Sequence, residues 1–205
     1  MFSNYIFDFD GTIADNFFVV VKVVTELNLR YKLIPPETLD FDKLRGSSTK
    51  DLLTQLKLPK LKYFYILFLL LTKLGKGTQK ASVVKDMYET LDELKGRGCL
   101  LGIVTSSRKK FVEAFLKSHG ISCFDFIDSS IHLFGKDKVL NKLIKKYELD
   151  PKETVYIGDE VRDIEAAKAA GMTTCAVTWG YNNEKILREA APDFVVHTAK
   201  EISII

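Results

Sequence analysis

The sequence predicts an α/β fold in which a Rossmann-like parallel sheet carries a small all-helical domain inserted after its first strand. Two observations lead to this prediction. From residue 80 onward, short apolar runs alternate with amphipathic segments, which is typical of parallel strands joined by helices. Between the first apolar run and the next, residues 15–79 show only helical patterns. We therefore expect an α/β core from residues 1–14 and 80–205, with a helical cap from residues 15–79.

The first strand is expected at the N-terminus, where MFSNYIF runs into DFDGT. Prolines and glycines then divide the insertion into helices. We expect helices over 17–29 and 61–74, further helices around a turn within 37–58, and a hinge at Gly75-Lys76-Gly77.

Glycines and prolines also mark the ends of the predicted core elements. In chain order, we expect a helix over 83–98, a strand over 99–107, a helix over 108–120, a short strand over 124–130, a helix over 137–149, a strand over 154–160, a helix over 161–171, a strand over 173–179, a helix over 182–190 and a strand over 193–197.

The composition is that of an ordinary globular protein and excludes several classes. The net charge of +3 is too small to indicate nucleic-acid binding, and basic residues form no stripe with interleaved aromatics. The three cysteines have no metal-ligand spacing, so we expect neither a zinc site nor a disulfide framework. The N-terminus lacks the layout of a signal peptide, because Asp8 and Asp10 interrupt it. These features predict a cytoplasmic protein.

The most apolar stretch, YFYILFLLL at 63–71, is too short to span a bilayer, which needs about 20 residues. We expect it to be a helix of the cap. The lysines that flank it leave a peripheral membrane contact as the lesser alternative. A homodimer surface is another alternative for this stretch.

Polar residues follow the predicted parallel strands where each strand ends. Ligands of open α/β sheets bind at this edge, so these side chains should lie together. They are Asp8 and Asp10 after the first strand, Thr105 and Ser106 after the second, Lys136 after the third, and Asp159 with Asp163 after the fourth. Each alone has an ordinary explanation, such as a helix cap or a solvated lysine. Together they would place four carboxylates at one sheet edge.

Four carboxylates in one place repel one another unless cations intervene. A hard oxygen-ligand site suits Mg²⁺, and a lysine supplies further positive charge. Mg²⁺, a carboxylate nucleophile, a hydroxyl and a lysine together favour phosphoryl transfer, whose transition state needs several fixed cations and donors. An aspartate can attack phosphorus, while a second acid protonates the leaving oxygen and then activates water.

At this point the residues resemble a known family. DFDGT at 8–12 resembles the first motif of the haloacid dehalogenase (HAD) superfamily, VTSS at 104–107 its second, and GDEVRD at 158–163 its fourth. The third motif is a lysine, and Lys136 has the expected position. The sequence from AAKAAGM through WGY to APDFVV, together with the insertion after the first motif, is similar to phosphoglycolate phosphatase-like members.

The resemblance implies a role for each matching residue. Asp8 would be the nucleophile and a Mg²⁺ ligand, and Asp10 the general acid/base, with its backbone carbonyl as another ligand. Lys136 would neutralise Asp8 and the phosphate. Asp159 would bind Mg²⁺, and Asp163 would hold the water shell of the metal. Thr105, the Ser106 N–H and the backbone N–H groups near Phe9 would bind the phosphate.

The chain departs from the family pattern at several positions. Lys136 is followed by Asp137 where proline is common, and Lys138 is an alternative for its role. Asn16 stands where serine or threonine usually follows Asp15. Asp10 itself disfavours haloacid chemistry, because relatives that process haloacids lack an acid there.

Arg45, in the segment LRGSSTKDLL, resembles a cap residue that reaches toward the active site. It could pair with a carboxylate or second phosphate of the substrate, or be an exposed arginine before a turn. The sequence therefore predicts a Mg²⁺-dependent phosphatase that hydrolyses a small phosphate monoester through an aspartyl-phosphate. A phosphomutase of the β-phosphoglucomutase type and a non-catalytic phosphate-binding protein are the alternatives. Phosphoglycolate, a nucleoside monophosphate, pyrophosphate and a sugar phosphate all fit as substrates.

Overall fold

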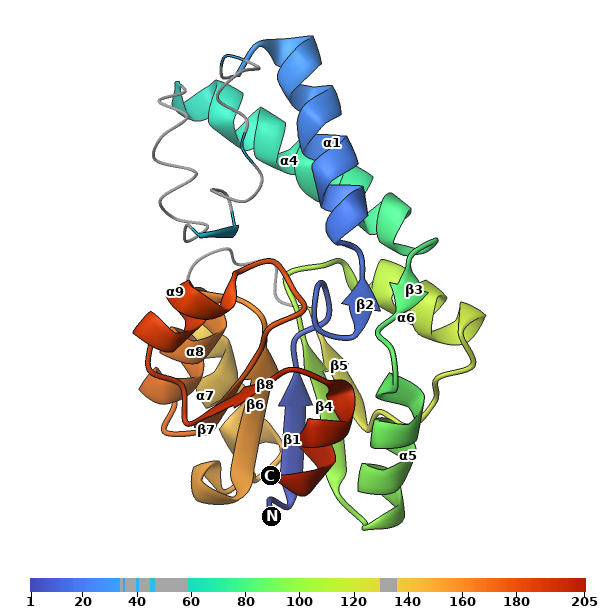
Figure 1. Cartoon of the computed structure of the whole chain (residues 1–205), viewed down its shortest axis with the longest axis vertical. Helices are drawn as coiled ribbons and strands as arrows, with labels where there is room; N and C mark the ends of the chain where they lie inside the picture. Colours follow the sequence, from blue (N-terminus) through green and yellow to red (C-terminus); the bar gives the residue numbers. More distant parts are fainter. Residues whose placement is uncertain (34, 36–39, 41–44, 47–58, 130–135) are drawn as a thin grey trace.

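The main sheet of the protein is parallel, as predicted. A computed structural model describes residues 1–33, 35, 40, 45–46, 59–129 and 136–205. Six strands pair in the order β5-β4-β1-β6-β7-β8, and every pairing is parallel (Figure 1). They are β1 (Asn4–Phe7), β4 (Leu100–Val104), β5 (Phe126–Asp128), β6 (Thr154–Gly158), β7 (Thr173–Val177) and β8 (Phe194–Val196). The first strand therefore lies inside the sheet, between β4 and β6.

The remaining elements of the described chain are helices, short 3₁₀ turns and one small antiparallel ribbon. The helices are α1 (Phe17–Tyr31), α4 (Lys60–Thr78), α5 (Met87–Gly96), α6 (Lys109–Ser118), α7 (Lys136–Lys146), α8 (Val161–Ala169) and α9 (Glu184–Glu189). The 3₁₀ turns are η2 (Pro151–Glu153) and η3 (Ala199–Ile204), and the ribbon pairs β2 (Ala14–Asp15) with β3 (Ser82–Val83). The helices predicted within 37–58 fall almost entirely outside the described residues.

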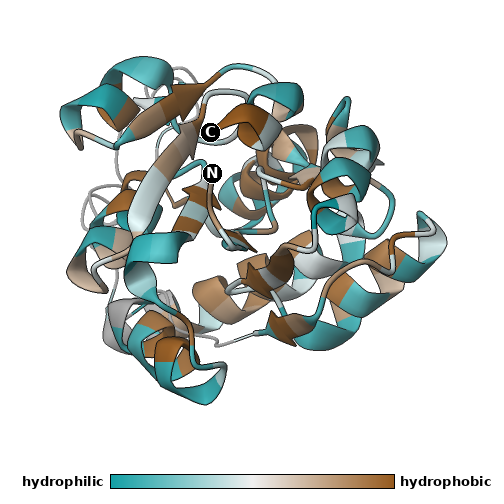
Figure 2. Cartoon of the chain, turned by 90° about the horizontal axis from the view of Figure 1, so that it is seen from below, coloured by the Kyte–Doolittle hydropathy of each residue, from teal (hydrophilic) through white to brown (hydrophobic). Residues whose placement is uncertain are grey.

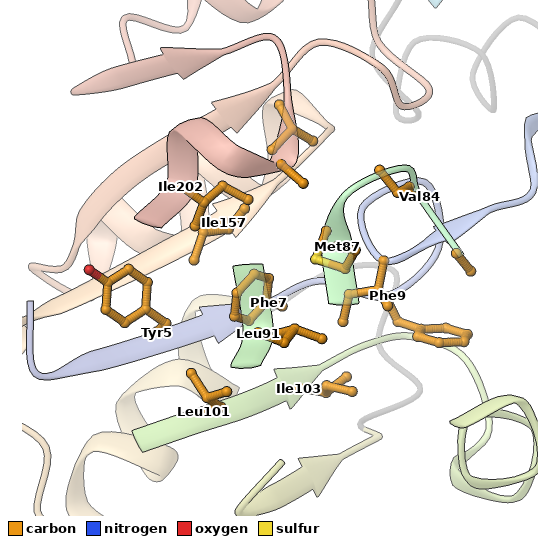
Figure 3. Packing of buried hydrophobic residues seen from close by; sticks show 14 of the residues in the cluster. Tyr5, Phe7, Phe9, Val84, Met87, Leu91, Leu101, Ile103, Ile157 and Ile202 are labelled. Carbon is orange, nitrogen blue, oxygen red and sulfur yellow. The ribbon is translucent and has the colours of Figure 1, made fainter. Parts of the chain in front are cut away.

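Alternate side chains of β1 supply the cores on the two faces of the sheet. Tyr5 and Phe7 lie in a cluster with residues of α5, α6 and η3 (Figure 3), whereas Ile6 packs with residues of α7 and α8. This alternation follows from the two-residue period of a strand. In Figure 2 the strands are largely brown and the helices around them are striped teal and brown. The helices thus bury one face each and hold the sheet between two layers.

The helices α1 and α4 pack on one another and extend beyond the carboxyl ends of the strands (Figure 1). The ribbon β2–β3 joins the start of this segment to its end, pairing Ala14 with Val83 and Asp15 with Ser82. This ribbon was missed in the sequence because two-residue strands carry no periodic pattern. The domain boundaries at 15 and 79 remain a prediction. Among the described residues, no helix is long and apolar enough to cross a membrane.

The hinge predicted at Gly75-Lys76-Gly77 is wrong, because α4 continues through it to Thr78. A Cβ atom at Gly75 would lie 2.2 Å from the ring of Phe111 in α6, and one at Gly77 would lie 2.3 Å from Val19 in α1. The two glycines therefore serve close packing of α4 against its neighbours. This explains why residues of low helix propensity occur in a helix.

Replacing Gly75 by alanine should destabilise the protein although alanine is the better helix former. The added methyl group overlaps the ring of Phe111, and such overpacking costs about 1–3 kcal/mol. Gly96→Ala, at the end of α5, is the matched control, because its Cβ position faces open space. We expect urea unfolding to give a lower free energy of unfolding for Gly75→Ala and an unchanged or higher one for Gly96→Ala. Equal stability of both variants would contradict the packing explanation.

Candidate active site

A tight turn after β1 presents the first two aspartates at the carboxyl edge of the sheet. The Asp8 N–H donates to the carbonyl of Ile157 at 2.8 Å, which continues the pairing with β6. The Phe9 carbonyl accepts from the N–H groups of Ile13 and Ala14 at 3.0 Å each, so the chain reverses at once. Gly11, in the middle of the turn, has φ of +81°, which side-chain-bearing residues rarely adopt. The side chain of Phe9 is fully buried in the core (Figure 3).

Three carboxylates converge around one lysine. Oxygen atoms of Asp8, Asp159 and Asp163 all lie within 4.8 Å of one another, and all three side chains are buried. Lys136, the first residue of α7, donates to Asp8 Oδ1 at 3.0 Å and to Asp163 Oδ1 at 2.6 Å. Its ammonium also lies 5.0 Å from the ring centre of Tyr156. Lys138 is exposed, so of the two candidates Lys136 is the lysine that meets the acids.

The three acids of this cluster carry more negative charge, when ionised, than the single positive charge of Lys136. Burial raises the pKa of Asp8 to about 7, although Lys136 lowers it. Burial and the charge of Asp8 also raise the pKa of Asp159 well above its usual value. Burial alone would lower the pKa of Lys136, but Asp163 and Asp8 raise it well above the ordinary value. The lysine is therefore firmly charged, and the acids need a further cation to ionise together.

The residues at this edge fit a divalent metal ion. The donor set is made of carboxylate oxygens, which hard cations such as Mg²⁺ prefer. Glycines let the backbone pack closely against Asp159: a Cβ atom at Gly11 would lie 2.3 Å from its Oδ2, and one at Gly180 would lie 2.2 Å from its Cβ. Thr12 Oγ1 and the Tyr181 N–H fix this carboxylate, donating to its two oxygens at 2.9 and 2.7 Å. A buried cluster of acids can thus bind a divalent cation.

Asp163 also caps the N-terminus of α8. Its Oδ2 accepts from the Glu160 N–H at 3.1 Å, and the Glu160 side chain accepts from the Asp163 N–H in a reciprocal capping box. Oδ1 of Asp163 accepts from Lys136. The capping box therefore fixes the Asp163 carboxylate where it binds the lysine. A Cβ atom at Gly158 would lie 2.5 Å from Asp163 Oδ2, so the preceding strand end must be glycine for this approach.

Neutral side chains are the hydrogen-bond donors to Asp10 in the described part of the chain. Asn16 Nδ2 donates to its Oδ1 at 2.6 Å, Thr78 Oγ1 donates to the same oxygen at 3.3 Å, and Ser107 Oγ donates to Oδ2 at 2.5 Å. Burial raises the pKa of Asp10, whereas these three hydrogen bonds lower it. The two neighbouring aspartates, Asp8 and Asp10, therefore lie in different chemical environments.

The second predicted motif lies at the end of β4, as expected. The Thr105 N–H donates to Asp128 O at 3.0 Å, and its buried hydroxyl accepts from the Ser107 N–H at 3.0 Å. Ser106 is half-buried beside it. Ser107, the last residue of this motif, contacts Asp10 and was not among the predicted site residues. The sequence VTSS contains three hydroxyl side chains, and the third, Ser107, could have been recognised as a further candidate site residue.

Arg45 lies against the loop that follows β7. Its Nη2 donates to the Gly180 carbonyl at 2.9 Å, and its guanidinium carbon lies 4.9 Å from the ring centre of Phe17. Its own backbone carbonyl accepts from the Asn183 N–H at 2.9 Å. Among the described residues, Arg45 Nε is one of two buried side-chain polar atoms without a hydrogen-bond partner, Thr72 Oγ1 being the other.

Tyr181 and Thr78 also reach the site, and sequence reasoning did not single them out. Tyr181 follows β7 and Thr78 ends α4, far from the recognised motifs in sequence. Both residues bind the Asn16 side chain, which binds Asp10, and Thr78 also donates directly to Asp10. The WGY sequence at 179–181 was visible, but no pattern in it indicates where the tyrosine points.

Comparison with known proteins gives a consistent family match. Residues 5–177 match the family model described as haloacid dehalogenase-like hydrolase. A phosphoglycolate phosphatase of Synechococcus elongatus is 29% identical over 198 residues, which are 96% of this chain and 93% of that protein. A pyrophosphatase of Bacillus velezensis is 32% identical over 131 residues, which are 62% of this chain and 61% of that protein.

Solved structures share the fold. A predicted phosphatase from Clostridium acetobutylicum superimposes with a TM-score of 0.83 at 20% identity, covering 100% of this chain and 98% of that chain. A haloacid dehalogenase-like hydrolase from Streptococcus pneumoniae gives 0.81 at 22% identity, covering 98% of this chain and 96% of that one. At such identities the likeness concerns the fold, and the predicted sheet architecture is confirmed.

The affinity of the acid cluster for a divalent cation should fall as pH falls. The pKa of Asp8 is raised to about 7 in the metal-free protein, and cation binding requires the ionised carboxylate. An unfolded aspartate titrates near about 3.9, so the metal-free folded state loses stability as pH rises from there toward 7. A bound cation removes this loss.

We expect saturating MgCl₂ or MnCl₂ to raise the Tm more at about pH 8 than at about pH 6. Differential scanning calorimetry with and without the salt measures this difference, and Asp8→Asn should reduce its pH dependence. An equal rise at both pH values in the unmodified protein would contradict the assignment of Asp8 to the cation site.

Proposed function

The chain belongs to the haloacid dehalogenase-like hydrolases, and from this we propose that it is a Mg²⁺-dependent phosphatase that hydrolyses a small phosphate monoester through an aspartyl-phosphate. The observation that carries the proposal is the division between the two aspartates after β1. Asp8 binds Lys136 beside two further acids, whereas Asp10 binds only neutral donors. One environment suits a charged nucleophile and the other suits a group that exchanges a proton.

In the first chemical step, a carboxylate oxygen of Asp8 attacks phosphorus and the bond to the ester oxygen breaks. Asp10 gives its proton to that leaving oxygen, which departs as an alcohol. Burial raises the pKa of Asp10 and so favours the protonated form that this step needs. Lys136, 3.0 Å from Asp8, offsets the negative charge that gathers between the carboxylate and the phosphoryl oxygens.

In the second step, water attacks the phosphorus of the aspartyl-phosphate. Asp10, now ionised, takes a proton from that water, and the bond between phosphorus and the Asp8 oxygen breaks. Inorganic phosphate leaves, and both aspartates return to their starting states. The Ser107, Asn16 and Thr78 donors stabilise the ionised form of Asp10 that acts as base here.

Three groups are proposed to bind the phosphoryl oxygens. They are the Thr105 hydroxyl, the Ser106 N–H and the N–H groups of the turn near Phe9. Within the described residues, no backbone carbonyl accepts from the N–H groups of Phe9 and Asp10, which supports this role. Mg²⁺ would be held by Asp8, the Asp10 carbonyl and Asp159, with Asp163 holding its water shell, and would add positive charge at the phosphoryl oxygens.

We further infer that residues 15–79 form a cap over this site. The pair α1 and α4 lies beyond the carboxyl ends of the strands, where the site is (Figure 1). The crossings between the two parts are then at Asp15 and at 79–83, since the helix includes Gly75 and Gly77. Closure of such a cap would exclude water until the leaving group has departed. We expect the protein to act in the cytoplasm on small molecules and without nucleic acid.

Phosphoglycolate and pyrophosphate are the substrates to test first, because similar proteins act on them by name. Arg45 is the proposed contact to a second anionic group, such as a carboxylate. Its Nη2 is bound to Gly180 and its buried Nε has no hydrogen-bond partner, so the guanidinium keeps N–H groups for an anionic group of the substrate.

Hydrolysis of para-nitrophenyl phosphate should require Asp8 and Mg²⁺. We expect Asp8→Asn to lower kcat by about 10³-fold or more, because the amide cannot act as nucleophile. EDTA should abolish the activity of the unmodified enzyme, and added Mg²⁺ should restore it. Asp92→Asn, an exposed acid on α5, is the control and should retain activity. Full activity of Asp8→Asn would refute the nucleophile assignment, and transfer of phosphate to sugar instead of water would favour the mutase alternative.

Arg45→Ala should raise KM for the preferred natural substrate by about tenfold while sparing para-nitrophenyl phosphate. The natural substrate loses one charge-assisted hydrogen bond, which the aryl ester lacks. Steady-state kinetics with both esters measures the difference, and Arg30→Ala, an exposed arginine on α1, is the control. An equal rise of KM for both esters would rule out direct substrate recognition.

A further inference from the structure

Asn16 is a buried junction between four parts of the chain. It precedes α1, is fully buried, and its side chain binds three others. Its Nδ2 donates to Asp10 Oδ1 at 2.6 Å and to Thr78 Oγ1 at 2.8 Å, and its Oδ1 accepts from the Tyr181 hydroxyl at 2.7 Å. These partners come from the turn after β1, the end of α4 and the loop after β7.

The protons in this network allow one orientation of the amide. Asn16 has two N–H donors on one side and one acceptor oxygen on the other. Tyr181 donates to the oxygen, so both N–H groups face Asp10 and Thr78. The Thr78 hydroxyl accepts from Asn16 and gives its own proton to Asp10 at 3.3 Å. A reversed amide would place its oxygen against the Asp10 carboxylate and leave the tyrosine hydroxyl facing an N–H group.

The Tyr181 hydroxyl is separable from the other contacts of this residue. The Tyr181 backbone N–H holds Asp159 Oδ2 at 2.7 Å, and the ring lies 6.4 Å from that of Phe17. Both contacts persist when tyrosine is replaced by phenylalanine, which removes only the oxygen. Among the described residues, the hydrogen-bond partner of this hydroxyl is Asn16, so the substitution isolates a single hydrogen bond.

The amide at position 16 also explains why the tyrosine is needed. Asparagine has an amide oxygen as well as two N–H donors, and a buried oxygen without a donor is costly. Tyr181 supplies that donor.

We propose that Asn16 and Tyr181 are positioning residues for Asp10: the Tyr181 hydroxyl fixes the orientation of the Asn16 amide, and the amide fixes the Asp10 carboxylate for proton transfer to the leaving group. Neither residue touches the substrate. The proposal rests on the proposed function, because it assigns Asp10 the proton-transfer role.

The test compares two esters of similar size, phenyl phosphate and para-nitrophenyl phosphate. Phenolate is the more basic leaving group and depends more on protonation by Asp10, so a misplaced Asp10 should slow its ester more. We expect Tyr181→Phe to lower kcat/KM about tenfold for phenyl phosphate and about twofold for para-nitrophenyl phosphate. Tyr88→Phe, a partly exposed tyrosine on α5, should leave both values unchanged.

A double-mutant cycle then asks whether Tyr181 acts through Asn16. Asn16→Ser removes the amide oxygen that Tyr181 holds, so Tyr181→Phe should cause no further loss in that background. Equal losses on both esters, no loss at all in Tyr181→Phe, or additive losses in the double variant would each overturn the proposal.

A readout without turnover separates this proposal from the proposed function. In the ¹⁵N-labelled protein, the side-chain amide signals of Asn16 should exchange slowly and should shift in Tyr181→Phe but not in Tyr88→Phe. Unchanged signals would overturn the positioning role even in an active enzyme. Absence of hydrolysis by the unmodified, Mg²⁺-loaded enzyme would refute the phosphatase assignment, and the positioning role of Asn16 for proton transfer would fall with it.

Discussion

The contacts of Lys136 with Asp8 and Asp163 are the interaction on which the site depends. Buried carboxylates this close cannot all ionise without cations, because desolvation and mutual repulsion both oppose it. One lysine balances part of that charge and leaves room for a divalent ion. The surrounding structure serves this arrangement: the capping box of α8 fixes Asp163, and glycines at 11, 158 and 180 let backbone and carboxylates approach closely.

At the same edge of the sheet, a single turn carries two acids with different surroundings. Asp8 is fixed by charge, whereas Asp10 is fixed by the neutral donors Asn16, Thr78 and Ser107. Because Asn16 and Thr78 lie at the two ends of the inserted helices, two of the three donors of Asp10 come from the crossings between sheet and helical segment. The proposed acid/base is thereby connected to the part of the chain that would cover the substrate.

The sequence was sufficient to predict the sheet and most of the acidic cluster. In a parallel sheet, residues that end successive strands meet at one edge, so Asp8, Lys136 and Asp159 could be placed together without coordinates. Side chains that act through tertiary contacts could not be placed: Tyr181 reaches Asp10 through Asn16, and Thr78 binds both Asn16 and Asp10. The hinge predicted at Gly75 and Gly77 was wrong, because a sequence does not distinguish a glycine that permits close helix packing from a glycine at a hinge.

The most direct test of the account is to look for phosphate on Asp8. Asp10→Asn should slow hydrolysis of the aspartyl-phosphate, so the intermediate accumulates during turnover of para-nitrophenyl phosphate. After an acid quench, borohydride converts an acyl phosphate to homoserine, and peptide mass spectrometry locates the product. The account predicts homoserine at position 8. Continued release of para-nitrophenol by the same variant, with Asp8 unmodified at every time point, would contradict the covalent mechanism.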